Sequence, residues 1–154
     1  MSLRDRLPSV PQRPNREGRR RRAPRARANS VALGQRGIPI DTLRVDGTDL
    51  DFRAARPIGD AKLYTGYTDL ERDHDDLARV EVRARDGRRG VTLWVDEGYP
   101  YLMVFTGDHP DVERPALAVE PMTCAPNAFQ SGDGLIRLEP GASVTTTWGI
   151  APQE

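Results

Sequence analysis

Two runs of alternating side chains, joined by a short turn, are the feature that most constrains this fold. Apolar and charged residues alternate through Leu77–Ala84, and Val91–Val95 again places an apolar residue at every second position. Because side chains along a strand point to opposite faces in turn, each run predicts a half-buried strand. Asp86 and Gly87 lie between the runs, and Asp-Gly is a strong hairpin signal. The sequence therefore predicts an antiparallel hairpin.

Several other segments favour strands, and none is convincingly helical. Tyr101–Thr106 is a nearly continuous apolar run, which is consistent with a strand buried on both faces. Shorter strands are predicted at 116–119, 135–138 and 143–150, whereas Tyr67–Asp76 can hold one helical turn at most. Many short strands with regular turn signals are typical of a sandwich, so we predict an all-β fold, an antiparallel β-sandwich.

The chain changes character near residue 36. Residues 1–36 are rich in Arg, Pro and Ala, and Asp5 and Glu17 are their only acids. Such a segment buries too little apolar surface to offset its ordering entropy, so we predict disorder there and a folded domain over 37–154. Three interpretations of the segment stay open: a basic arm that binds nucleic acid, a solvated tail without a task, or sequence foreign to the domain that a misplaced start would add.

Cysteine content and hydropathy bear on where the chain works. Cys124 is the only cysteine, which rules out an internal disulfide and suits a reducing compartment. No apolar run approaches the roughly 18 residues of a membrane span, and the N-terminal segment lacks the apolar stretch of a secretory signal. We therefore expect a cytoplasmic protein with no membrane partner.

Glu120 is the residue with the clearest chemical potential. It is predicted to end an apolar strand and to enter a loop between Pro121 and Pro126. A carboxylate among apolar residues usually has a partner or a task, and a tuned carboxylate can transfer protons. The alternative is an ordinary glutamate paired with one of the many arginines, because structural ion pairs also perturb carboxylates. The residues alone leave both interpretations open.

Four segments resemble the aldose 1-epimerase (galactose mutarotase) family. Residues 117–129 (LAVEPMTCAPNAF) resemble the loop that carries the family's catalytic glutamate, and 50–59, 104–108 and 138–150 resemble three further family motifs in the family order. The resemblance runs from about Gly37 to the C-terminus and corresponds to the C-terminal part of a normal member. It implies part of a galactose-mutarotase-like supersandwich, truncated at the N-terminal side.

The resemblance also implies a reaction. Members of this family interconvert the α and β anomers of an aldohexose by acid/base ring opening, with no metal or organic cofactor. Glu120 stands at the position of the catalytic base, whereas the acid is a histidine in the N-terminal half that this chain lacks. We therefore expect a truncated form with weak or no activity.

Three further residues match positions that contact the sugar. Tyr64 stands where the family has a sugar-binding aspartate, and Met103 stands where some members have a glutamine; Phe105 follows in the same strand. Tyr64 cannot supply the two acceptor oxygens of a carboxylate. His74 and His109 both lie in turn-like sequence away from the family's histidine positions, so we expect solvated histidines and no metal site.

Partners and alternatives follow from the same features. The expected partner is a small aldohexose, and the strand edges left open by truncation are expected to favour self-association. One alternative is a β-sandwich that binds carbohydrate without catalysis. The other, which we expect less, is a nucleic-acid binder that acts through its basic arm.

Overall fold

Eight strands and one short helix make up the described part of the chain. The computed structural model describes residues 29–33, 38–84, 86–108 and 116–153. Within these residues the elements are β1 (Asn29–Leu33), β2 (Pro39–Arg44), β3 (Tyr64–Thr68), β4 (Ala78–Arg83), β5 (Gly90–Val95), β6 (Tyr101–Phe105), β7 (Ala118–Met122), α1 (Ala128–Ser131) and β8 (Trp148–Gln153). No described helix is long and apolar enough to cross a membrane.

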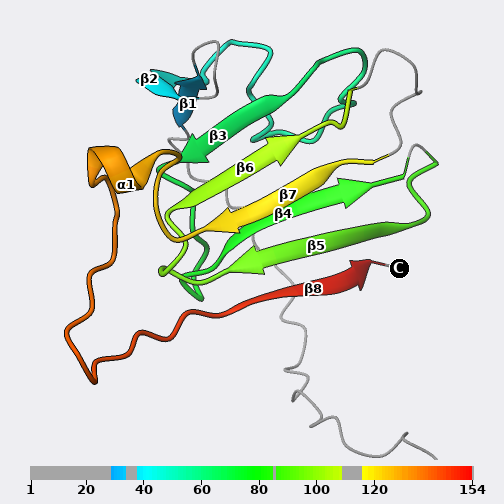
Figure 1. The fold of residues 1–154 in the computed structure, drawn as a ribbon. Helices are drawn as coiled ribbons and strands as arrows, with labels where there is room; N and C mark the ends of the chain where they lie inside the picture. Colours follow the sequence, from blue (N-terminus) through cyan, green and yellow to red (C-terminus); the bar gives the residue numbers. More distant parts are fainter. Residues whose placement is uncertain (1–28, 34–37, 85, 109–115, 154) are drawn as a thin grey trace, which may run out of the picture.

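The strands form two antiparallel sheets that pack against each other. The five-stranded sheet has the order β2-β1-β3-β6-β7, and the three-stranded sheet has the order β4-β5-β8. Every described strand pair is antiparallel (Figure 1). The predicted fold class, an all-β antiparallel sandwich, is confirmed.

The two strongest strand predictions are also confirmed. In the β4–β5 hairpin Val82 pairs with Val91 and Val80 with Leu93, so the apolar residues of both strands share one face. The Gly87 N–H donates to the Ala84 carbonyl at 2.9 Å and closes the turn. Strand β6 is buried on both faces at its centre, where Leu102 is 4% and Met103 is 7% exposed.

Two C-terminal predictions were wrong. Residues 135–138 belong to no described strand, and β8 begins at Trp148 rather than near residue 143. The ladder stops there because the Thr147 N–H donates to the side-chain carboxylate of Asp96 rather than to a backbone carbonyl. The Thr146 hydroxyl donates to the Tyr99 hydroxyl oxygen, in the turn after β5, at 2.9 Å.

The N-terminal elements were placed less well. Strands β1, β2 and β3 were not predicted as strands. Residues 67–76, judged able to hold one helical turn at most, contain no described helix, and the short helix α1 lies after β7 instead. Strand β1 lies on the N-terminal side of the boundary proposed at residue 36, and it pairs with both β2 and β3. Residues 1–28 lie outside the described residues, so the disorder predicted there stays a prediction.

The core lies between the two sheets. Leu102 from β6 and Val119 from β7 pack against Ala78, Leu93 and Val95 of the three-stranded sheet. These residues define the inner face of each sheet, because side chains in register share a face. The opposite face of the five-stranded sheet, called the open face below, therefore points away from the core.

The guanidinium of Arg72 reinforces the join beside this core. Its Nη1 donates to the carbonyls of Asp76 at 3.2 Å and Val95 at 3.3 Å, and its Nη2 donates to the Tyr99 carbonyl at 3.1 Å. Arginine suits this role because its planar fork presents several donors at once. One side chain thus fixes the ends of the segments before β4 and after β5.

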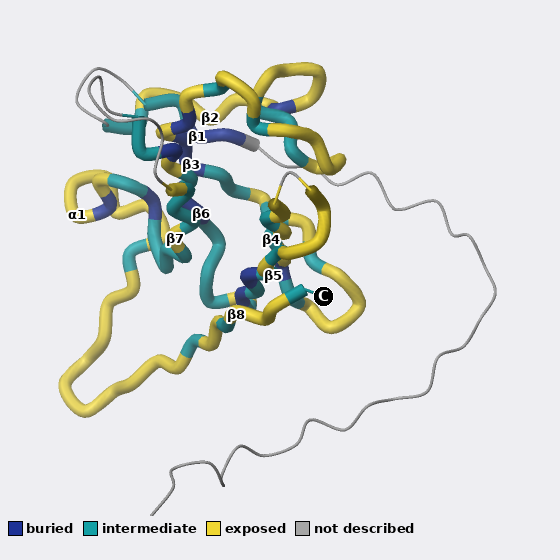
Figure 2. The backbone as a smooth tube through the Cα atoms, turned by 90° about the vertical axis from the view of Figure 1, so that its right-hand side faces the viewer, coloured by how far each residue is buried: buried dark blue, intermediate teal, exposed yellow. Residues whose placement is uncertain are grey.

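The five-stranded sheet covers the inner face of β4 and β5 but not that of β8. Trp148 and Ile150 pair with Val95 and Leu93 and share their face, yet they are 50% and 63% exposed. Trp148 is therefore not a core residue, because nothing in the described part of the chain packs over its strand as the five-stranded sheet packs over β5. Figure 2 shows β8 and the segment leading to it as largely exposed.

Candidate functional site

The open face of the five-stranded sheet gathers all four residues predicted for the site. Tyr64 pairs with Phe105 across β3 and β6, and Met103 pairs with Glu120 across β6 and β7. Met103 and Phe105 are two residues apart in one strand, so both pairs point to the same face. Segments far apart in sequence thus bring these four side chains together on three adjacent strands.

Glu120 occupies the interior of an edge strand rather than a loop. Strand β7 continues to Met122, so the prediction that Glu120 ends the strand was wrong. Proline breaks most strands because it lacks an N–H, but an edge strand tolerates it, which explains why Pro121 does not end β7. Glu120 is exposed beside the buried Met103. Its carboxylate can therefore meet a ligand over an apolar floor.

The aromatic pair lies one row further along the same face. The rings of Tyr64 and Phe105 meet edge to face with centroids 5.8 Å apart, and they are 58% and 39% exposed. The fully buried Thr106 holds this end of the sheet, since its Oγ1 accepts the Leu63 N–H at 2.9 Å. The pair offers apolar ring edges and one phenol to a ligand.

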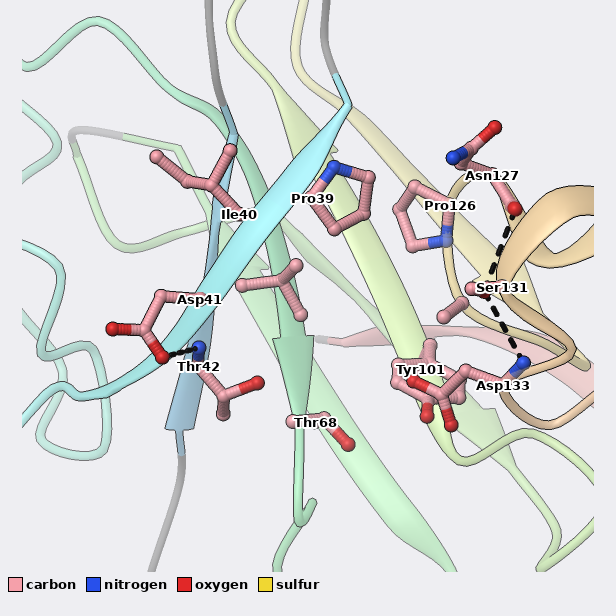
Figure 3. A pocket seen from close by; sticks show the side chains of 12 residues that line it. Pro39, Ile40, Asp41, Thr42, Thr68, Tyr101, Pro126, Asn127, Ser131 and Asp133 are labelled. Atoms are coloured by element: carbon pink, nitrogen blue, oxygen red, sulfur yellow. Dashed lines mark hydrogen bonds between the residues drawn. The ribbon is translucent and has the colours of Figure 1, made fainter.

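A groove opens on the same face, between the β2 edge and the segment that contains α1. Its volume is about 330 Å³. Figure 3 shows the two walls, with Tyr101 and Asp133 near one end. The lining residues are Val31, Pro39, Ile40, Asp41, Thr42, Thr68, Tyr101, Ala125, Pro126, Asn127, Ser131 and Asp133.

Hydrogen bonds hold the α1 wall of the groove. The Ser131 hydroxyl contacts the Asn127 carbonyl at 3.4 Å and accepts the Asp133 N–H at 3.2 Å. Gly134 has a φ of +67°, and a Cβ there would lie 3.2 Å from the Tyr101 ring, so glycine lets this segment approach Tyr101 closely. The wall is therefore built against the sheet.

Tyr101 is the principal polar group at its end of the groove. Burial raises the pKa of Tyr101 above 10.0, and the hydrogen bond to the Asp133 carboxylate raises it further, whereas the bond to Thr68 lowers it. The phenol therefore stays protonated near neutral pH and donates to Asp133. Tyr101, Thr68 and Asp133 form a connected set of hydroxyl and carboxylate groups at this end of the groove.

Comparison with known proteins decides the family. A family model described as aldose 1-epimerase matches residues 26–150. The chain belongs to the aldose 1-epimerase family. The match begins before β1, which agrees with the place of that strand in the sheet.

One curated relative was found. The chain is 33% identical over 115 residues to an uncharacterized protein, YihR, of Escherichia coli (strain K12), and the match covers 74% of this chain and 35% of YihR. The chain thus spans about a third of the length of the curated relative that it matches. No solved structure matches it significantly.

His74 does not contribute to the open face. His74 is exposed in the turn after Arg72, where its Nε2 lies 3.2 Å from the Asp75 carboxylate. One ligand atom each from Asp73, His74 and Asp75 lies within 4.8 Å of the others, an arrangement that could hold a metal ion, although exposed acidic groups of this kind are common without one. His109 lies outside the described residues.

The groove was missed by sequence reasoning. Thr42, Thr68 and Asp133 are ordinary polar residues with no motif around them, and they meet only because β2, β3 and the segment after α1 converge. Tyr101 was predicted only as the first residue of a buried strand, not as a polar group of a site. Cys124, between β7 and α1, is half-buried.

Proposed function

We propose that this chain acts as an aldose 1-epimerase-like protein that interconverts the α and β anomers of an aldohexose. Glu120 is the base that takes the proton from the anomeric hydroxyl. The ring C–O bond then breaks as the ring oxygen gains a proton, the aldehyde rotates, and the ring closes on its other face. The reverse proton transfers restore Glu120. We place this activity in the cytoplasm, because the chain has a single cysteine.

One observation carries the proposal. Glu120, in the family's motif, is an exposed carboxylate on the open face, with Met103 directly opposite and the Tyr64–Phe105 pair one row away. An acid/base group must reach the substrate's hydroxyl, and this placement leaves its carboxylate accessible. The aromatic pair offers apolar edges for the C–H groups of a sugar ring.

The second proton transfer limits the rate. The family resemblance gives the acid role to a histidine, and no histidine lies on the open face among the described residues. Tyr64 stands in place of the family's aspartate and lacks the second acceptor oxygen of a carboxylate, so binding of the sugar hydroxyls is weaker. With water protonating the ring oxygen, we propose that the chain keeps the base step and works slowly.

Polarimetry with freshly dissolved α-D-glucose or α-D-galactose tests the proposal. The protein should speed the drift in rotation above the buffer rate, and Glu120→Gln should return it to that rate, because general acid/base groups contribute about 10²–10⁴-fold. Glu97→Gln is the matched control, since Glu97 is an exposed glutamate in the turn after β5. Equal acceleration by Glu120→Gln and the native protein would rule out the base role.

The same sample separates the alternatives. Saturable binding of the sugar with no acceleration would indicate a carbohydrate-binding domain without catalysis. Binding to DNA or RNA that weakens steeply with salt, and disappears when residues 1–36 are removed, would instead favour the basic-arm interpretation.

A further inference from the structure

Strand β8 forms one edge of the three-stranded sheet, and it differs from the other described edge strands in charge (Figure 1). An edge strand presents unpaired backbone groups to other chains, and proteins commonly protect it with charged side chains. The charged residues of the other three described edges are Asp41 and Arg44 in β2, Arg79, Glu81 and Arg83 in β4, and Glu120 in β7. Strand β8 carries none, and residues 140–153 include no Asp, Glu, Lys, Arg or His. The edge of β8 therefore lacks charged protection against pairing.

The ladder register identifies the backbone groups on the free side of β8. The Asp96 N–H donates to the Thr147 carbonyl at 3.0 Å, so these two residues form a hydrogen-bonded pair. Bonded and non-bonded pairs alternate along antiparallel strands. Trp148, Ile150 and Pro152 are therefore at non-bonded positions, and their backbone groups face away from β5. Proline costs nothing in the β5 ladder at such a position, because the N–H that it lacks would point to the free side.

This edge is complementary to the same edge of a second copy. When two β8 strands lie antiparallel with their Ile150 residues opposite each other, each Ile150 N–H faces the Ile150 carbonyl of the other copy. Each Trp148 N–H likewise faces the Pro152 carbonyl of the other copy. Only the Trp148 carbonyl lacks a donor, because proline has no N–H.

The side chains of β8 also match in this arrangement. A two-fold axis perpendicular to the sheet keeps the inner faces of both copies on the same side. The exposed Trp148 and Ile150 side chains of the two copies then form one apolar surface, and directly opposite Cβ atoms lie about 4.5–5.5 Å apart. Because residues 140–153 are uncharged, the two strands meet without like-charge repulsion.

We propose that two copies of this chain pair through β8, antiparallel about a two-fold axis at Ile150. The three-stranded sheets of the two copies then join into one sheet of six strands. The assembly closes at a dimer, because each copy uses its single β8 edge. The pairing is independent of the proposed activity, since it involves neither Glu120 nor the groove.

The association should be weak and depend on concentration. The contact is centred on one strand of six residues, whereas stable interfaces use about 20–30 residues a side. Sedimentation velocity of the full chain at rising concentration should therefore show a monomer–dimer equilibrium with no larger species.

A lysine substitution tests the position of the two-fold axis. Ile150→Lys places two like charges directly opposite each other and should raise the dissociation constant at least about tenfold. Ile40→Lys is the matched control, since Ile40 is an exposed isoleucine in the edge strand β2, and it should leave the constant unchanged. Circular dichroism shows whether each variant is folded.

Cross-linking tests the same contact without a change of charge. Cys124→Ser removes the only cysteine, so a new cysteine is then the only thiol. With Ile150→Cys the paired Cα atoms would lie about 5.5 Å apart, within the range of a disulfide, and oxidation by copper phenanthroline should give a linked dimer. Ile40→Cys in the same background should link much more slowly.

Three results would overturn the proposal. The first is a native chain that stays monomeric up to about 1 mM, beyond the range of specific association. The second is equal weakening of association by Ile150→Lys and Ile40→Lys, which would place the contact elsewhere or make it non-specific. The third is equal linking rates for Ile150→Cys and Ile40→Cys.

Discussion

Two halves of one sheet face differ sharply in this molecule. On the inner face of the three-stranded sheet, Leu93 is 8% exposed, whereas its partner in the ladder, Ile150, is 63% exposed. Val95 and Trp148 repeat the contrast at 1% and 50%. These side chains are neighbours of similar chemistry on a continuous surface, and only the cover above them differs.

The contrast shows that β8 carries apolar side chains on the same face as the core residues of β5, but that no facing strand covers them. The alternation of β8 matches that of a half-buried strand, but the five-stranded sheet reaches only as far as β4 and β5. Adjacent exposed apolar side chains favour association between molecules. Substitutions at Leu93, Gly149 and Ile150 test whether packing from the facing sheet or a neighbouring strand, rather than residue type, sets a residue's contribution to stability.

The largest effect is expected for Leu93→Ala. Removing a buried leucine side chain costs about 2–5 kcal/mol of unfolding free energy, because transfer energy is lost and a cavity remains. Urea unfolding followed by circular dichroism measures it. A loss below about 1 kcal/mol would mean that the covered half of the sheet is not a packed core.

Arg72→Ala tests what holds the covered half in place. The change removes the donors to the Asp76, Val95 and Tyr99 carbonyls, and we expect a loss of about 1.5–3 kcal/mol, typical of hydrogen bonds that involve a charged group. Arg88→Ala, in the exposed hairpin turn, is the control and should change the unfolding midpoint little. Similar losses for both arginines would argue against a structural role for Arg72.

Gly149→Ala tests the other face of β8. A Cβ at Gly149 would lie 2.5 Å from the Trp94 ring, which covers this glycine from the neighbouring strand. We expect a loss of about 1–3 kcal/mol from overpacking. The loss should shrink in a Trp94→Leu background, as a double-mutant cycle would show. Unchanged stability would mean that the Trp94 ring does not pack on Gly149 and that β8 is uncovered on both faces.

Acid should act on a loop outside both sheets. The hydrogen bond from Arg53 lowers the pKa of Asp51 from 3.8 to about 2. Because the folded pKa lies below the unfolded one, this stabilisation is present above pH 4 and is lost as the pH falls towards 2. The stability difference between native protein and Asp51→Asn should therefore vanish across that window, equally in a Leu93→Ala background.

Ile150→Ser should change stability least. An exposed site normally contributes within about 0.5 kcal/mol, so the unfolding midpoint in dilute solution should stay nearly constant. Self-association, which we expect of the native chain, should weaken because the apolar surface around Trp148 is interrupted. Sedimentation velocity measures this. A large loss of stability in the monomer would show that β8 is covered after all.

Local pattern predicted the strands whose neighbours are close in sequence. The β4–β5 hairpin needed only alternation and an Asp-Gly turn. In contrast, β3 carries Gly66 and several threonines and tyrosines, which give little hydrophobic periodicity. It is a strand because β1 and β6, from distant parts of the chain, supply its ladder partners.

The site was predicted only in part, because local sequence identifies motifs but not which distant segments meet. Motif resemblance named Tyr64, Met103, Phe105 and Glu120, and the ladder registers bring them to one face. The groove could not be predicted, because Thr42, Thr68 and Asp133 have no shared pattern in sequence. The alternating pattern also could not predict how exposed each residue of β8 is. Trp148 has the apolar character of a core residue, and its exposure follows only from the extent of the facing sheet.

The central claim is that Glu120 transfers the proton in anomer exchange. Magnetisation exchange between the α and β anomeric protons of glucose, followed by nuclear magnetic resonance, measures that step directly and detects slow turnover. We predict an exchange rate above that of buffer for the native chain and for Glu97→Gln, and the buffer rate for Glu120→Gln. Equal exchange rates for the native chain and a folded Glu120→Gln variant would contradict the account.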